Sequence, residues 1–298
     1  MIIHVVKSGD TIQSIANQYG LSPERIIIEN ELPNPDKLVI GQSIGIRIPD
    51  VVHTVVEGDT LYKIAQTYDV EANQILQNNP QIAAREGLNP GDVLVITYKN
   101  EEPIDTIITN GYAYPFIDRT VLRKTLPFLT YLSLFTYGFT PTGELIPIDD
   151  KELIALAKDF GVAPIMVLAP MNAQGEFSSE SAHNMFANQQ VQTTLINNLV
   201  AAMQEKGYAG IDIDFEFILP EDKEGFLNFI TAVNTRLNEA GLITFVALAP
   251  KVSGEMKGLL YEAHDYPAIG GVADKVLLMT YEWGYTYGYT SRMSSKKP

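Results

Sequence analysis

Residues 209–217 read Ala-Gly-Ile-Asp-Ile-Asp-Phe-Glu-Phe, a stretch in which acidic and apolar side chains alternate. Side chains on a β-strand point alternately to its two faces, so the pattern predicts one strand whose acidic face carries Asp212, Asp214 and Glu216. Three carboxylates that lie so close together do not all ionise at their reference pKa values, and we expect at least one to hold a proton at neutral pH. A proton held in this way is what a general acid needs.

The alternative interpretation is an amphipathic strand with a solvated acidic face. The neighbouring segments favour catalysis, because they look like parallel strands that are buried on both faces. Candidate strands lie at residues 106–114, 131–137, 163–170, 210–217, 243–249 and 275–281, and helical stretches at 149–160, 188–206 and 221–240. Repeated strand–helix units predict an α/β fold of the (β/α) barrel type, whose active site gathers at the carboxyl ends of the strands.

The barrel region follows a short polar linker at residues 98–104, and we assign residues 99–298 to the barrel region. A complete barrel has eight strands and about 250 residues, whereas this region offers six candidate strands before a polar tail. We therefore expect a (β/α)8-type TIM barrel that lacks its last strand–helix units, as in a truncated product. Its open first and sixth strands would favour association, although the sequence does not define an oligomeric state.

Composition narrows the classes of partner. The chain has 36 acidic and 21 basic residues and a formal net charge of −15, which disfavours nucleic acid and anionic membrane surfaces. It has no cysteine, and its four histidines (His4, His53, His183, His264) show no ligand spacing, so we predict no metal site and no cofactor. No apolar run is long enough to insert into a membrane, and the N-terminus lacks the pattern of a secretory signal.

Residues 2–48 and 52–97 are two copies of one unit, displaced by 49 residues at the start of each copy. The segment His4–Ile12 aligns with His53–Leu61 around a shared Gly-Asp-Thr, and Asn30 aligns with Asn79. Each copy predicts a strand, a turn, two helices, an Asn-containing loop and a final strand, with Asp or Thr capping the first helix. Two small repeats side by side indicate modular binding, and we place them at residues 1–49 and 50–98.

The repeated Gly-Asp-Thr, the following Ile-Ala and the loop Asn resemble the LysM module, a small α+β unit of βααβ order. The resemblance implies binding of N-acetylglucosamine-containing glycans such as peptidoglycan and chitin. By position, the implied glycan-binding residues are Gly9, Asp10, Thr11, Asn30, Gly58, Asp59, Thr60, Asn79 and Pro80. A turn glycine, a capping Asp or Thr and a loop Asn also have ordinary roles in folding, which is the alternative for each.

The stretch Gly-Ile-Asp-Ile-Asp-Phe-Glu resembles the signature of glycoside hydrolase family 18, although the first Asp of that signature is replaced by Ala209. Members of the family use the 2-acetamido oxygen of the substrate as the nucleophile. The resemblance implies that Glu216 is the general acid/base, that Asp214 holds and polarises the acetamido group, and that Asp212 supports Asp214.

A second match lies at Leu278-Met279-Thr280-Tyr281-Glu282-Trp283, which resembles the Met-x-Tyr-Asp of the sixth strand of the family. By position, Tyr281 would donate to the acetamido oxygen as a fourth catalytic residue. Further substrate-binding candidates are Met279, Glu282 and Trp283, together with Tyr112, Tyr114 and Tyr137 at the ends of the first two strands. For Tyr281 and Trp283 the alternative is packing in the core.

Two LysM modules ahead of a family 18 barrel resemble the bacterial spore-cortex-lytic glucosaminidases. The resemblance implies a hydrolase that cleaves beside N-acetylglucosamine in cortex peptidoglycan during germination, located at the spore cortex or cell wall without a classical signal peptide. Two alternatives follow from the missing strands: an inactive remnant whose modules alone bind peptidoglycan or chitin, or a misfolded gene product.

Overall fold

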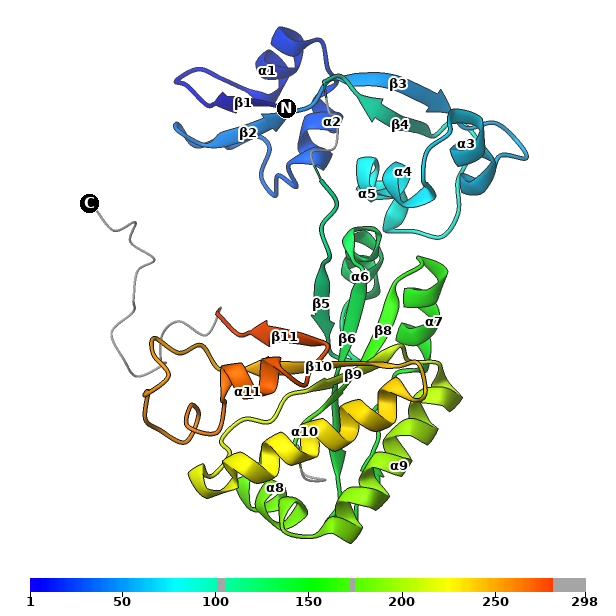
Figure 1. Cartoon of the computed structure of the whole chain (residues 1–298). Coiled ribbons are helices and arrows are strands. Elements are labelled where there is room, and N and C mark those ends of the chain that lie inside the picture. The colour runs from blue at the N-terminus through cyan, green and yellow to red at the C-terminus, as the bar shows by residue number, and fades with distance from the viewer. Residues whose placement is uncertain (101–104, 172–174, 281–298) are drawn as a thin grey trace. The chain divides into compact units, whose positions relative to one another are not determined.

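The computed structural model describes residues 1–100, 105–171 and 175–280, which form two compact units. The first unit comprises Met1–Thr109 and Ile117–Thr130, and the second comprises Asn110–Phe116 and Tyr131–Pro298. Figure 1 labels the helices and strands of both units.

The first unit holds the two predicted modules, which have the predicted order of elements. The first module contains β1 (Ile2–Val5), α1 (Ile12–Tyr19), α2 (Pro23–Glu29) and β2 (Ser43–Ile46), with β1 antiparallel to β2. The second contains β3 (Pro49–Thr54), α3 (Leu61–Tyr68), α4 (Ala72–Asn78), the short α5 (Pro80–Ala83) and β4 (Val93–Tyr98), with β3 antiparallel to β4.

Thr11 and Thr60 cap the first helix of each module, as predicted. The Thr11 side chain accepts from the backbone N–H of Ser14, at 3.0 Å, and the Thr60 side chain accepts from that of Lys63, at 3.2 Å. Each cap satisfies a backbone donor that the first helical turn leaves without a partner.

A second network also repeats in both modules. The His4 ring lies 3.1 Å from both the Asp10 carboxylate and the Tyr19 hydroxyl, and His53 contacts Asp59 and Tyr68 in the same way. These two histidines therefore have structural roles.

Residues 117–130, which the sequence analysis assigned to the barrel region, lie in the first unit. They form α6 (Arg119–Thr125) and η1 (Leu126–Phe128), which contact α5 and α4. Gln77 of α4 donates to the Pro127 carbonyl at 2.7 Å, and Arg123 of α6 pairs with Glu86 at 2.5 Å. The second module and this segment are thus packed as one body.

The second unit is built on a curled parallel sheet, which confirms the predicted barrel-type α/β fold. Its six parallel strands in the described residues are β5 (Asn110–Ala113), β6 (Tyr131–Phe139), β8 (Ala163–Leu168), β9 (Gly210–Ile213), β10 (Ile243–Leu248) and β11 (Lys275–Leu278), in that spatial order. A short β7 (Leu145–Ile146) pairs antiparallel with the end of β6. Each parallel strand falls within or beside a predicted one.

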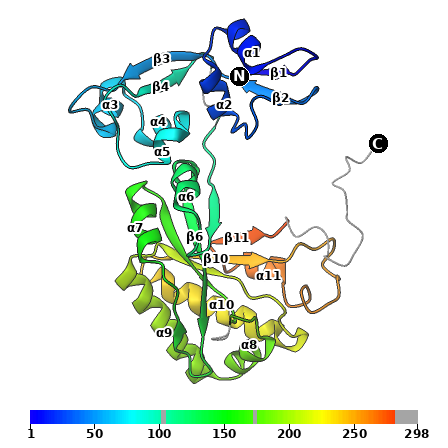
Figure 2. The same cartoon turned by 180° about the vertical axis from the view of Figure 1, so that it is seen from behind.

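Helices connect the strands and cover one face of the sheet. They are α7 (Lys151–Asp159), α8 (Ser179–Phe186), α9 (Gln189–Lys206), η2 (Pro220–Asp222), α10 (Lys223–Asn238) and α11 (Tyr266–Gly270). Helix α10 lies in front of the sheet in Figure 1, whereas β6 and β10 lie in front of α10 when the molecule is seen from behind in Figure 2. Helix α10 therefore covers one face of the sheet, and the other face is turned away from it.

Glycine is required where β9 begins. A Cβ atom at Gly210 would lie 2.2 Å from the carbonyl oxygen of Ile243, so no larger side chain fits while β9 and β10 pair. The Gly of the Gly-Ile-Asp-Ile-Asp-Phe-Glu stretch thus permits the close pairing that sets the register of the acidic residues.

Asn30 and Asn79 play the same structural role in the two modules. The Asn79 side-chain amide donates to the carbonyls of Ile75 (2.7 Å) and Val95 (2.8 Å), and its oxygen accepts from the Val95 N–H at 2.9 Å. Asn30 makes the equivalent bonds to Ile26 and Gly45. Each Asn joins the end of the second helix to the last strand of its module.

We expect Asn79→Ala to destabilise the first unit by about 3 kcal/mol, because buried Val95 groups lose their partners. Thermal unfolding and hydrogen exchange of the Val95 amide measure the effect. Asn17→Ala removes the same side chain from an exposed position on α1 and serves as the control. Equal stability of the two variants would show that the Asn79 bonds contribute nothing net.

Candidate active site

The predicted acidic strand is shorter than expected. Strand β9 ends at Ile213, so Asp212 lies on the strand while Asp214 and Glu216 lie in the segment that follows it. The backbone N–H of Asp214 still donates to the Leu168 carbonyl of β8, at 2.9 Å. The single-strand prediction for residues 210–217 was therefore wrong in length.

The alternation of side chains between the two faces of the sheet continues beyond the end of β9, at Phe215. Its side chain is fully buried and stacks on Phe226 and Phe229 of α10, with ring centroids 5.8 and 5.6 Å apart, and on Phe139 at 6.0 Å. Because this ring is held among other aromatic rings, the residues on either side of it face the opposite way. Asp214 and Glu216 consequently point into the same cavity.

His264 fixes the backbone between these two acids. The Ala249 N–H donates to its Nδ1 at 3.0 Å, so Nε2 carries the proton and donates to the Phe215 carbonyl, also at 3.0 Å. Burial lowers the pKa of His264, which keeps the ring neutral in this role. His264 thus joins the chain after β9 to the chain after β10.

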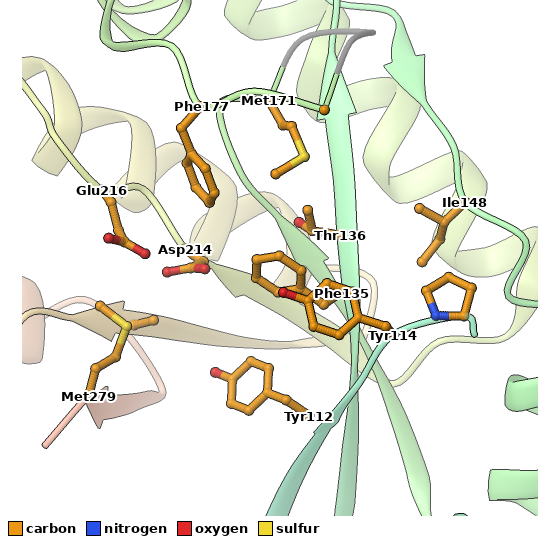
Figure 3. A pocket seen from close by; sticks show the side chains of 13 residues that line it. Tyr112, Tyr114, Phe135, Thr136, Ile148, Met171, Phe177, Asp214, Glu216 and Met279 are labelled. Carbon is orange, nitrogen blue, oxygen red and sulfur yellow. The ribbon is translucent and has the colours of Figure 1, made fainter. Parts of the chain in front are cut away.

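Asp214 and Glu216 line a cavity of about 680 Å³ at the carboxyl ends of the strands. In Figure 3 their carboxylates extend into it from the same side. The other lining residues are mostly apolar or aromatic: Tyr112, Tyr114, Pro115, Phe135, Thr136, Ile148, Met171, Gly175, Phe177, Ala247 and Met279. An apolar pocket with a few convergent polar groups is typical of a small-molecule or sugar site.

Asp212 lies beneath this cavity and is fully buried. Its carboxylate accepts a short hydrogen bond from the Tyr112 hydroxyl. Burial raises the pKa of Asp212 to about 6, while Tyr112 and the Ser133 hydroxyl act in the opposite direction. A carboxyl with this pKa gains and loses its proton slightly below neutral pH, and the cause is burial rather than the repulsion between neighbouring carboxylates that the sequence analysis invoked.

Tyr137 was predicted at the cleft, and the structure contradicts this. Its hydroxyl donates to Asp150 at 2.5 Å and accepts from Lys206 at 2.6 Å, and its side chain is buried away from the cavity. The pairing of β6 with β8 shifts register between Leu134 and Tyr137, which ends the simple alternation. Phe135 and Thr136 line the cavity instead.

Sequence reasoning missed most of the aromatic and apolar lining residues. Phe135 and Thr136 lie at the register shift, and Phe177 lies in the long connection after β8, where no periodicity marks a side chain as inward-facing. Tyr114 was a candidate for the cleft in the sequence analysis, and it lines the cavity. Its ring stacks on that of Phe116 at 5.1 Å and meets Phe135 edge-on at 5.1 Å.

The predicted module residues lie in turns and caps. Gly9 and Gly58 have positive φ values of 91° and 88°, which favour glycine in these turns. Asp10 and Asp59 accept from the backbone N–H groups of Lys7 and Val56, at 2.7 and 2.8 Å, in addition to the histidine contacts.

The remaining module candidates differ in exposure. Thr11 and Thr60 are exposed, whereas Asn79 is fully buried and Pro80 begins α5. Among these residues, the exposed turn and the capping threonines are available to a glycan, and the Asn79 side chain is occupied by the fold.

Comparison with known proteins places these features in families. The LysM domain model matches residues 4–47 and 53–97, and the model for glycosyl hydrolases family 18 matches residues 173–297. The cortical fragment-lytic enzyme of Bacillus subtilis (strain 168) is 34% identical over 304 residues, covering 100% of this chain and 69% of the relative. The chain belongs to the LysM-containing glycosyl hydrolases of family 18.

Two solved structures of family members match the whole fold. The spore cortex-lytic enzyme SleL of Bacillus megaterium QM B1551 is 37% identical, with a TM-score of 0.72 over 95% of this chain and 66% of that chain. SleL of Bacillus cereus is 30% identical, with a TM-score of 0.73 over 96% and 67% of the two chains. This chain therefore spans about two thirds of the length of these relatives.

The family 18 match includes residues that the structure does not describe. Tyr281, Glu282 and Trp283 lie outside the described residues. Met279 is described, is buried, and lines the cavity beside Ala247 of β10. Across the described ranges, no group of three His, Cys, Asp or Glu side chains is placed to hold a metal ion, and no helix is long and apolar enough to cross a membrane.

The pKa of Asp212 leads to a stability prediction. The pKa of Asp212 in the folded state, about 6, exceeds the ordinary value of 3.8. The contribution of Asp212 to the stability of the folded state is therefore complete below about pH 4 and is lost as the pH rises through 6. The Asp212→Asn variant carries no titrating side chain at this position. We expect the variant to gain about 2 kcal/mol relative to the parent chain between pH 4 and pH 7.

The measurement is chemical unfolding of the second unit of both proteins at several pH values. A stability difference that does not change with pH would show that Asp212 titrates at its ordinary value. Asp159→Asn, an exposed Asp at the end of α7, is the control for the general effect of charge.

Proposed function

We propose that this chain hydrolyses N-acetylglucosaminyl bonds in spore-cortex peptidoglycan by substrate-assisted catalysis that retains the anomeric configuration. The observation that carries the proposal is the convergence of Asp214 and Glu216 on one apolar cavity, above the buried Asp212. The relatives named for lysis of cortical fragments supply the substrate class. On this basis the protein acts in germination and is associated with the spore or the cell wall.

The proposed reaction begins with the sugar's own acetamido group. Its carbonyl oxygen attacks the anomeric carbon as the bond to the leaving oxygen breaks, and Glu216 gives its proton to that oxygen. Asp214 accepts a hydrogen bond from the acetamido N–H and stabilises the charge of the cyclic intermediate. Water then attacks the anomeric carbon from the face that the leaving group vacated, Glu216 takes a proton from this water, and the bond between the acetamido oxygen and the anomeric carbon breaks.

Asp212 assists through its proton. A group whose pKa is about 6 takes up and gives back a proton near neutral pH, so Asp212 is able to share one with Asp214 when the product sugar departs. The Tyr112 hydroxyl stabilises the ionised form of Asp212 when the proton is shared away. Tyr281 is proposed to donate to the acetamido oxygen, on the family resemblance alone.

The charge of the cavity supports an uncharged sugar at the reacting position. Among the described lining residues the ionisable acids are Asp214 and Glu216, and there is no Lys or Arg. A muramic acid carboxylate would meet like charge there, whereas N-acetylglucosamine carries none. Aromatic rings such as Tyr114 and Phe135 offer faces on which pyranose rings stack.

The modules are proposed to hold the polymer through the exposed turns at Gly9–Thr11 and Gly58–Thr60. The net charge of −15 gives no general attraction to a wall polymer that carries carboxylates, so hydrogen bonds and stacking must supply the affinity. Holding the polymer near the cavity raises the local concentration of substrate.

We expect Glu216→Gln to reduce hydrolysis of cortex fragments by at least about 100-fold, because the general acid is lost while the cavity keeps its shape. Mass spectrometry of new N-acetylglucosamine reducing ends measures turnover, and co-sedimentation with cortex measures binding. Glu205→Gln changes an exposed acid on α9 in the same way and should match the parent chain.

Equal turnover by the Glu216 and Glu205 variants would reject the proposed mechanism. No turnover by the parent chain, with binding retained, would instead favour a protein whose modules bind peptidoglycan or chitin without catalysis.

A further inference from the structure

The two LysM modules share a cluster of polar side chains, which we call the intermodule cluster. It consists of Arg25, Glu29 and Arg47 from the first module and Asn78 and Tyr98 from the second. Both modules belong to the same compact unit.

Tyr98 lies at the centre of the cluster. Its hydroxyl donates to the Glu29 carboxylate at 2.5 Å and accepts from Arg25 at 2.6 Å, while Arg25 and Glu29 are also paired at 2.5 Å. Arg25 further donates to the Asn78 carbonyl at 3.1 Å. Charge-assisted bonds of this kind hold two surfaces in one orientation more firmly than neutral ones.

Arg47 contacts both Tyr98 and Asn78 of the second module. Its guanidinium lies 3.6 Å from the centre of the Tyr98 ring and donates to the Asn78 side-chain oxygen at 3.2 Å. The Asn78 amide in turn donates to the Ile96 carbonyl of β4 at 2.9 Å. Arg47 therefore stacks on Tyr98 and hydrogen-bonds to Asn78, so one side chain of the first module holds two residues of the second.

The cluster is largely shielded from water. Tyr98 is 6% exposed, Asn78 is 7% exposed, and the Glu29 side chain is 6% exposed. Buried polar groups are costly when they lose their partners, so separating the modules would break bonds that water does not already compete for. Residues 47 and 48 alone join β2 to β3, which further limits the freedom of the modules.

The cluster lies next to Asn30 and Asn79, the loop residues that the sequence analysis included among the predicted glycan-binding positions. Glu29 and Asn78 occupy equivalent positions in the two repeats, 49 residues apart, and each is followed by the Asn that ties its loop to the last strand. The ends of the two second helices are thus fixed to one another. The loops that leave those ends have a set spacing.

We propose that the two LysM modules bind glycan as one preorganised two-site unit, held by the intermodule cluster. The occupant is an extended N-acetylglucosamine-containing glycan chain that reaches both sites, and a disaccharide fills only one. A rigid pair avoids the entropy of ordering two independent modules when the second site binds. The inference rests on the proposed glycan binding of the modules.

The rigidity of the pair is tested without any ligand. The chain has no cysteine, so Gln18→Cys on α1 and Gln66→Cys on α3, both exposed, accept one spin label in each module of the full chain. We expect a single narrow distance distribution, and a broader one when Arg47→Ala or Tyr98→Phe is added. A broad distribution in the chain with an intact cluster would overturn the proposal.

Binding measurements test whether the rigid pair of modules increases the affinity for a long glycan. We expect Arg47→Ala to weaken binding to insoluble peptidoglycan about 10-fold or more, while the affinity for N,N′-diacetylchitobiose changes less than about twofold. Arg85→Ala removes an arginine whose ion pair with Asp92 lies within the second module, and serves as the matched control. Tyr98→Phe, which keeps the ring, repeats the test with a milder change.

The outcomes separate the two proposals. Equal loss of affinity for polymer and disaccharide, or no loss from either variant despite a broadened distance, would overturn the two-site unit. If the parent chain binds neither ligand, the proposed glycan binding fails, and the two-site proposal fails with it even where the distance distribution is narrow.

Discussion

Burial of the Phe215 ring between the sheet and α10 sets the geometry of the candidate active site. The ring is in contact with the aromatic side chains of Phe226 and Phe229, and its carbonyl is held by His264. Removing a buried Phe side chain generally costs about 3–5 kcal/mol, so this contact can hold a short segment that has already left the sheet. The two acids beside it have little freedom to turn.

The same constraint explains why the acids lie beyond β9 rather than on it. Pairing with β10 ends at Ile213, where the chain would otherwise continue as a flat strand. The aromatic cluster draws the backbone toward the helices, and only the bond from Asp214 to β8 persists. An acid at the end of a strand reaches the cavity, whereas Asp212, one pleat earlier, stays buried below it.

Much of this arrangement could be predicted from the sequence, because it depends on local periodicity. Alternation with period two identified the inward acids, and the strand–helix alternation located all six parallel strands of the described chain. Strand ends were less predictable, since they depend on the ring contacts of Phe215, whose partners on α10 come from a later part of the chain. The prediction for Tyr137 was wrong for a related reason, because its partners Asp150 and Lys206 are 13 and 69 residues away in the sequence.

The two repeats show a different limit of sequence reasoning. Similarity between copies reveals what each module needs in order to fold, such as Asn30 and Asn79, whereas the contacts between these two copies are made at positions at which they differ. Glu29 and Asn78 are equivalent in sequence and different in chemistry. The Glu29 carboxylate accepts from Arg25 and Tyr98, whereas the Asn78 side-chain amide accepts from Arg47 and donates to the Ile96 carbonyl. Two identical acids at these positions would have placed like charges together with too few donors between them. Divergence at that pair of positions therefore lets both side chains take part in the contacts between the modules.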